Sequence, residues 1–147
     1  MVDTTDIDRA KDSGAGWVAE HVRRYLETDG AEGHEWNGVP TLVLVTTGRR
    51  SGQRRRTALI YGRDGDDFVV VASKGGAPEH PSWYINLEAD LQAAVQVGAD
   101  RYQVRARTAD AEEKARLWPV MAQIWPDYEE YAKKTDRDIP VVILQRT

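Results

Sequence analysis

Five arginines stand within eight positions of this 147-residue chain, and they are Arg49, Arg50, Arg54, Arg55 and Arg56. Without them the formal net charge of −4 would fall to −9, so the cluster is a local reversal of charge in an acidic protein. Such a concentration of one sign points to a polyanionic partner. The planar guanidinium group also suits bidentate contacts with phosphate or carboxylate oxygens.

Two glycines flank the start of this cluster, Gly48 and Gly52. They supply the backbone freedom of a tight turn, and we expect their amide N–H groups to be free to meet anionic oxygens. A hairpin turn with a solvated basic rim is the alternative interpretation, because charged runs usually face solvent.

A second Gly-rich loop, residues 74–78, follows an apolar run that is typical of a buried strand. Binding sites often use loops of this kind, since a rigid strand presents adaptable backbone. The chain also has five tryptophans and six tyrosines. Together these features can hold a flat, anionic cofactor, and they favour chemistry that the cofactor itself carries.

Several other chemistries are excluded or disfavoured. The absence of cysteine excludes disulfides, thiolate metal sites, iron–sulfur clusters and a cysteine nucleophile. His21, His34 and His80 are isolated, with no ligand-spaced partner, so no metal site is predicted. Residues 48–52 match neither a nucleophile elbow nor a phosphate-binding P-loop.

The composition is that of an ordinary globular protein, with 41% hydrophobic and 30% charged residues. No apolar run approaches the ~20 residues of a membrane span, and the acidic amino terminus lacks the regions of a signal peptide. A cytoplasmic location is therefore expected. The negative net charge argues against a nucleic-acid partner and favours one compact anion.

The first 38 residues are predicted to form a weakly patterned tail, one amphipathic helix from Trp17 and a Gly-rich connection. Val18, Val22 and Tyr25 repeat at helical spacing. The helix is expected to pack on the domain, with peripheral contact to a membrane surface as the alternative. Trp17, Tyr25 and Trp36 are the aromatic side chains that the rest of the fold is expected to need least.

Residues 39–147 are predicted to hold six strands, at residues 39–46, 54–61, 68–73, 92–97, 101–108 and 139–144. Alternation along the second strand places Arg55, Thr57, Leu59 and Tyr61 on one face and Arg54, Arg56, Ala58 and Ile60 on the other. Helices are predicted at residues 81–89 and after a capping box of Asp110 and Glu113. Pro119 is expected to kink or restart the latter helix near Trp118.

The predicted fold class is α+β, mainly β. Strands joined by hairpin turns favour a six-stranded, mostly antiparallel barrel with flanking helices over a parallel sheet. A chain of this length suits a small closed barrel that is filled by its own side chains, which leaves a cofactor on the rim.

At residues 46–53, 72–78, 83–87 and 125–140 the sequence resembles the deazaflavin-dependent nitroreductase family, the actinobacterial split-barrel reductases that use coenzyme F-420. The four blocks occur in the family's order, and the resemblance covers roughly residues 39–144. It implies a split β-barrel of the FMN-binding type that binds the reduced deazaflavin, with its phospholactyl-oligoglutamate tail. The deazaflavin then passes a hydride to a quinone, enone or nitro-type acceptor.

The resemblance also implies roles for individual residues. By their positions in the family's pattern, Arg50 and Arg55 are expected to bind the cofactor's tail, with Arg49, Gln53 and Arg54 as weaker candidates. The residues expected to contact the ring system are Ala72, Ser73, Lys74, Gly75, Ala77 and Pro78, with Trp83 and Asn86 nearby. Tyr128 and Tyr131 line the acceptor pocket, and Ser73, Tyr128 and Tyr131 are the candidate catalytic groups, with solvent as the alternative proton source. Helix packing is the alternative role for the two tyrosines.

The family's nitroimidazole-activating member has tyrosines where this chain has Ile60 and Trp125. Nitroimidazoles are therefore expected to be poor substrates. Two alternatives to the deazaflavin reading remain at this point: a split barrel that binds flavin mononucleotide, and a barrel that binds a polyanion without catalysis. Five arginines suit an oligoglutamate tail better than a single phosphate, and the chain shows no broad basic face.

Overall fold

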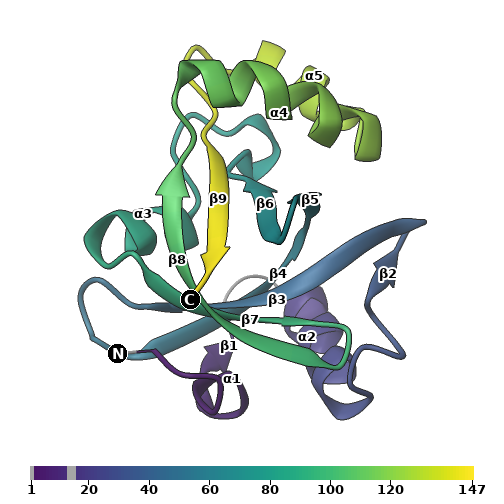
Figure 1. Ribbon diagram of the computed structural model, residues 1–147, viewed down its shortest axis with the longest axis vertical. Helices are drawn as coiled ribbons and strands as arrows, with labels where there is room; N and C mark the ends of the chain where they lie inside the picture. Colours follow the sequence, from purple (N-terminus) through teal and green to yellow (C-terminus); the bar gives the residue numbers. More distant parts are fainter. Residues whose placement is uncertain (1, 13–15) are drawn as a thin grey trace.

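The computed structural model of the protein describes residues 2–12 and 16–147, and it is built around one strongly curved sheet (Figure 1). The strands are β1 (Lys11–Asp12), β2 (Glu35–Trp36), β3 (Val39–Thr47), β4 (Arg54–Ile60), β5 (Gly62–Asp64), β6 (Asp67–Val71), β7 (Gln92–Val97), β8 (Asp100–Thr108) and β9 (Val141–Arg146). The helices are α1 (Asp6–Arg9), α2 (Gly16–Glu27), the 3-10 turn η1 (Lys74–Gly76), α3 (Ser82–Ala89), α4 (Ala111–Ile124) and α5 (Asp127–Lys134).

The strands follow the order β1-β4-β3-β7-β8-β9-β6-β5, with β2 paired to β3 beside this path. Neighbouring strands are antiparallel except for the short parallel pair of β1 and β4. Only Tyr61 separates β4 from β5, so the chain itself joins strands that stand near opposite ends of the order. The sheet thus curls into a barrel that is split rather than closed by hydrogen bonds.

The mainly-β, mostly antiparallel split barrel with flanking helices is confirmed. The six predicted strands are β3, β4, β6, β7, β8 and β9, but the count of six is wrong, because β1, β2 and β5 are also present. These three strands span two or three residues each, which is too short for an alternating pattern to show. The closed barrel was also wrong, since the ladder of the described residues ends at β1 and β5.

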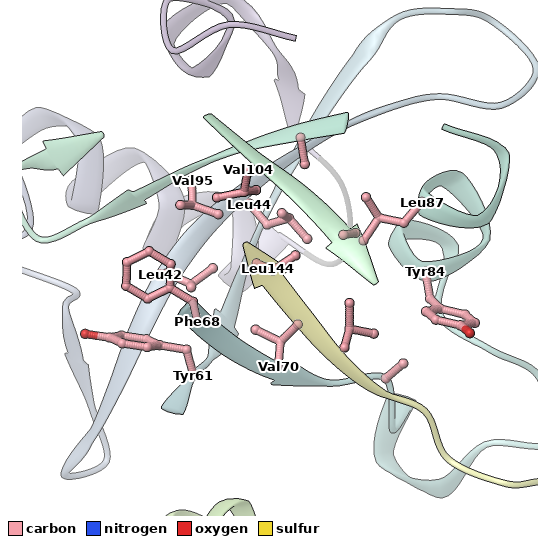
Figure 2. Close-up of a cluster of buried hydrophobic side chains, with 14 of the residues drawn as sticks. Leu42, Leu44, Tyr61, Phe68, Val70, Tyr84, Leu87, Val95, Val104 and Leu144 are labelled. Atoms are coloured by element: carbon pink, nitrogen blue, oxygen red, sulfur yellow. The ribbon is translucent and has the colours of Figure 1, made fainter. Parts of the chain in front are cut away.

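Apolar side chains from both walls of the barrel meet in its interior (Figure 2). Leu42, Phe68 and Val95 come from three different strands, and all are fully buried. Leu59 and Tyr61 of the β4 edge pack against this interior cluster, whereas Ala58 packs against a second cluster beneath α2. The predicted alternation is therefore confirmed for Leu59 and Tyr61 on one face and Ala58 on the other.

Two helical layers cover the barrel. Val22 and Tyr25 of α2 pack with Val43 and Val45 on the outer side of β3, while Leu117 and other residues of α4 and α5 pack on β6 and β9. In Figure 1 these layers lie at opposite ends of the molecule, with α4 and α5 at the top and α2 at the bottom. The barrel thus holds its two helical layers apart on either side of one open edge.

Tyr25 corrects the expectation that this side chain is dispensable. Its side chain is fully buried, and its hydroxyl donates to the carbonyl of Thr41 at 3.0 Å and accepts from the backbone N–H of Gly98 at 2.7 Å. It therefore ties α2 to both β3 and the β7–β8 turn. The sequence pattern marked its face of the helix but not the polar groups that its hydroxyl would meet.

Stability should depend on the protonation of Tyr25. Burial raises the pKa of its hydroxyl to about 12 from an ordinary 10.0, so between these pH values the unfolded chain loses the proton first and the native state is disfavoured. We expect roughly 2 kcal/mol of unfolding free energy to be lost across that interval. Urea unfolding of the native protein and Tyr25→Phe measures it, and pH curves of equal slope would contradict the assignment.

One further expectation was wrong, and one segment proved more ordered than its weak pattern indicates. α4 runs without interruption through Pro119, because that residue is exposed and the carbonyl freed by its missing N–H, at Ala115, also lies on the exposed face. The tail before Gly16 is ordered over residues 2–12. There Ile7 is fully buried, and the carboxylate of Asp8 accepts two hydrogen bonds from Arg101 at 2.8 Å.

Candidate functional site

Two adjoining cavities of about 560 Å³ each form one trough along the open edge of the barrel. Thr57, Lys74, Pro81 and Trp83 line both cavities and join them. The first cavity, called the basic half here, is lined by Asp12, Thr46, Gly48, Arg49, Arg50, Ser51, Arg55, Arg56, Thr57, Lys74, Pro81, Ser82, Trp83 and Asn86. Five of its lining side chains are cationic, and Asp12 is the one acidic group among the described residues that line it.

The arginines of the cluster divide between two tasks. Arg56 donates to Asp12 at 2.6 Å and to the carbonyl of Ile7 at 2.9 Å, so it holds the amino-terminal segment. Arg50 and Arg55 line the basic half, and within residues 2–12 and 16–147 neither guanidinium has a hydrogen bond or an ion pair. Their charge is therefore available to a bound anion.

The turn between β3 and β4 is held from inside the protein. Buried Asn86 of α3 accepts from the backbone N–H of Arg49 at 3.2 Å and from its guanidinium at 2.9 Å, and donates to Thr46 at 3.2 Å. The amide N–H groups of Gly48 and Gly52 bond within the turn, to Gln53 and Gly48 carbonyls. The expectation that these two amides are free was therefore wrong, and anion binding there is left to the other groups of the turn that line the basic half, among them Arg50 and Ser51.

Arg137 holds the second loop, residues 72–78, in place. Its guanidinium donates to the carbonyls of Ala72, Ser73 and Ala77 at 3.2, 2.7 and 2.9 Å, and lies 3.0 Å from Nδ1 of His80. One side chain thus donates to three carbonyls, none of which is paired with a neighbouring strand. Sequence reasoning missed this role of Arg137. The one hint in the sequence was that this arginine lies inside the block at residues 125–140.

Helix α5 approaches the same loop through Gly76. A Cβ at Gly76, whose φ is +83°, would lie 2.7 Å from the carbonyl oxygen of Tyr131. Only glycine allows so close an approach with this backbone conformation. The contact fixes α5, and with it Tyr131, against the loop that carries Ser73 and Lys74.

The second cavity, called the aromatic half here, is lined by Trp17, Val18, His21, Trp36, Thr41, Thr57, Ala58, Leu59, Ile60, Val71, Ser73, Lys74, Gly75, Pro81, Trp83, Trp125, Tyr128 and Tyr131. Trp36 stacks on Trp17 with ring centroids 6.1 Å apart and contacts Trp125 at 5.3 Å. This chain of rings connects α2 to the start of α5 across the trough. It gives the cavity flat, apolar walls that exclude water.

Two tyrosines, Tyr128 and Tyr131, line the aromatic half. Burial, with a smaller effect of Tyr131, raises the pKa of Tyr128 above its ordinary range, so this hydroxyl keeps its proton at neutral pH. Tyr131 accepts a hydrogen bond from the indole N–H of Trp125 at 3.4 Å, which leaves its own proton available for donation. Both hydroxyls are suited to donate to an acceptor oxygen.

The predicted site residues fall into two groups. Arg49, Arg50, Arg55, Ser73, Lys74, Gly75, Trp83, Asn86, Tyr128 and Tyr131 line the trough. Gln53, Arg54, Ala72, Ala77 and Pro78 are not among the residues that line either half. Arg54 contacts Asp6 of α1 at 3.3 Å and Thr47 at 2.5 Å, and Ala72 and Ala77 contribute carbonyls to Arg137.

The aromatic half also contains residues that sequence reasoning did not place there. His21 and Thr41 line it from α2 and β3. Nothing in the local pattern links these two positions, because they meet only when α2 packs on the barrel. Over the parts of the chain that the structure describes, no cluster of three or more His, Cys, Asp or Glu could hold a metal ion.

Comparisons with known proteins agree on one group. Residues 17–146 match the model of the F420H(2)-dependent quinone reductase family. An F420H(2)-dependent quinone reductase of Mycobacterium tuberculosis is 42% identical over 130 residues, covering 86% of this chain and 87% of the relative. A second, putative quinone reductase of that species is 41% identical over 107 residues, covering 73% of this chain and 90% of its own.

Solved structures give the same result. An F420-H2 dependent reductase superposes with a TM-score of 0.68 at 39% identity, covering 72% of this chain and 94% of that one. A structure described as a domain-swapped dimer has a TM-score of 0.71 at 38% identity, over 88% and 97% of the two chains. A haem storage protein of Vibrio cholerae, at 14% identity and a TM-score of 0.58, shares the fold alone.

Proposed function

The chain belongs to the F420H(2)-dependent quinone reductase family, and from this premise we propose that its trough holds reduced coenzyme F-420 and takes a quinone-type acceptor. The observation that carries the proposal is the division of the trough. Its basic half contains Arg50 and Arg55 without protein partners in the described chain, and its aromatic half has flat, apolar walls.

The residues present fit the coenzyme in both halves. An anionic tail of phosphate and glutamates needs several cations in one groove, and Arg49, Arg50, Arg55 and Lys74 line such a groove. A planar ring system needs apolar flat surfaces, and Trp83 stands where the two halves join. We assign the tail to these arginines, and the ring to Ser73, Lys74, Gly75 and Trp83.

When bound, the reduced deazaflavin supplies a hydride. The protein must hold the acceptor in contact distance, exclude water and stabilise negative charge on the acceptor oxygen. Trp36 and Trp125 supply the flat walls, and we assign to the hydroxyls of Tyr128 and Tyr131, which line the same cavity, the role of donors to that oxygen. The hydroxyl of Ser73 lines the same cavity and is the third candidate donor.

Replacing Tyr131 by phenylalanine tests this role. We expect about a tenfold fall in kcat for menadione with KM within about twofold, because a transition-state hydrogen bond affects turnover rather than binding. Tyr102→Phe is the matched control, since it removes a phenol hydroxyl from a tyrosine that lines neither half of the trough. If Tyr131→Phe changes neither constant, the tyrosine packs the helix and solvent supplies the proton.

Peripheral contact with a membrane is a further part of the proposal. Trp17, near the start of α2, is 63% exposed, and Arg23 and Arg24 on the same helix are exposed as well. A tryptophan on a helix that also carries arginines suits an anionic lipid surface, where lipid headgroups would compete with Glu20, the partner of both arginines. Among the described residues no helix has the length and apolar character to span a bilayer. Co-sedimentation with anionic vesicles should fall in Trp17→Ser, and equal binding of both proteins would remove the proposal.

A further inference from the structure

We propose that Asp12 determines how the trough discriminates between short and long anionic tails of its cofactor, an inference that rests on the proposed function. The basic half contains Asp12, which is alone there as an acid among the described residues. A carboxylate in a groove that binds an anion lowers its affinity. Binding of the tail alone therefore does not explain why Asp12 lies in this groove.

The contacts of Asp12 link it to one arginine. Its Oδ1 accepts from Nε of Arg56 at 2.6 Å, with 36% of the Asp12 side chain and 15% of the Arg56 side chain exposed. Arg56 also donates to the carbonyl of Ile7 at 2.9 Å. Both residues line the basic half, so this ion pair forms part of the wall that an anion meets.

The backbone fixes the carboxylate at this place. β1 pairs in parallel with β4, with Lys11 opposite Arg55 and Asp12 opposite Arg56. Asp12 thus stands one residue along the ladder from Arg55, which has no partner in the described chain. Within the basic half, the positive charges of Arg50 and Arg55 are therefore open to a bound anion, whereas the charge of Arg56 is already neutralised by Asp12.

This difference between the arginines should affect the binding of an anionic tail according to the length of that tail. We take a short tail to be neutralised by Arg50 and Arg55 and to end one ladder position before the compensated pair. Each further carboxylate of a longer tail meets Asp12, which repels it and already occupies Arg56. Native protein should therefore gain little affinity from additional glutamates.

Asp12→Asn tests the inference, because the amide oxygen can still accept from Arg56 while the charge is removed. Binding of reduced coenzyme with a short and with a long glutamate tail is measured for both proteins at low salt. We expect the long-tail form to bind about fivefold more tightly to Asp12→Asn and the short-tail form to change less than about twofold. High salt should reduce the difference.

Asp8→Asn is the matched control. Asp8 lies on the same segment and is ion-paired with Arg101, and it is not among the residues that line either half of the trough. It removes the same charge from the same segment, and we expect it to leave the ratio of the two affinities unchanged. A similar change of ratio in Asp8→Asn would show that the segment's order, not the charge at Asp12, sets the preference.

The outcomes separate this inference from the proposed function. If native protein binds both forms and Asp12→Asn strengthens neither, or strengthens both equally, the role of Asp12 is refuted and the function stands. If native protein binds neither form, the proposed function is refuted, and this inference, which rests on it, is refuted as well.

Discussion

Replacing Arg50 and Arg55 together by alanine should weaken binding of the deazaflavin by roughly 30- to 150-fold. Both guanidiniums line the basic half, and neither has a partner within residues 2–12 and 16–147. Charge-assisted hydrogen bonds contribute about 1.5–3 kcal/mol each, and less on a solvated rim, so about 2–3 kcal/mol for the pair is expected. A fluorescence titration at fixed salt measures the loss.

The folded state should change little, because neither guanidinium makes a hydrogen bond or an ion pair with the described residues. The control is Arg23→Ala with Arg105→Ala, which removes two positive charges from exposed positions outside the basic half. That control should bind nearly as well as native protein. Equal losses in both double variants would show that net charge, and not these two guanidiniums, governs binding.

Replacing Arg137 by alanine should give the largest loss of stability among single changes near the site. The guanidinium donates to three backbone carbonyls of the second loop and contacts His80. Without it the carbonyls of Ala72 and Ala77 lose this donor, whereas that of Ser73 still accepts from the N–H of Gly76 at 2.9 Å, and we expect a cost of about 2–4 kcal/mol. Thermal unfolding should shift downward by about 5–15 °C.

Arg116→Ala is the matched control for Arg137→Ala. Arg116 also makes two hydrogen bonds through its guanidinium, to Asp64 at 2.9 and 3.0 Å, but its side chain is 56% exposed. Exposed pairs contribute at most about 1 kcal/mol, so its unfolding should change little. If Arg137→Ala is no more destabilising than this control, the loop does not depend on Arg137.

Local patterns predicted the long strands well. β7 begins and ends at the residues predicted for it, and the alternation along β4 correctly separated Leu59, on the barrel interior, from Ala58, beneath α2. Residues within a few positions of one another are enough for such predictions.

What the sequence could not show depends on contacts between distant parts of the chain. The order of residues 2–12 comes from ion pairs such as Asp8 with Arg101, 93 positions apart. Tyr25 likewise meets Gly98 across 73 positions. A local window sees an acidic tail and an amphipathic helix, and it cannot see the partners that bury them.

The candidate site was found for a different reason. A cluster of arginines and a Gly-rich loop are recognisable without knowing the fold, and the trough brings Arg50, Arg55 and Lys74 together. The error at Gly48 and Gly52 shows the limit of this reasoning, because glycine predicts a turn but not which carbonyls its amides will meet. Arg137 was missed for the same reason.

The central claim is that this trough brings a reduced deazaflavin and a quinone together. Its most direct test is single-turnover mixing of the protein, loaded with reduced coenzyme F-420, with menadione, followed by the absorbance of the oxidised deazaflavin. We predict fast oxidation that saturates with menadione, slower reaction with a nitroimidazole, and none of this behaviour with flavin mononucleotide as the donor. Oxidation no faster than in a protein-free mixture would contradict the account.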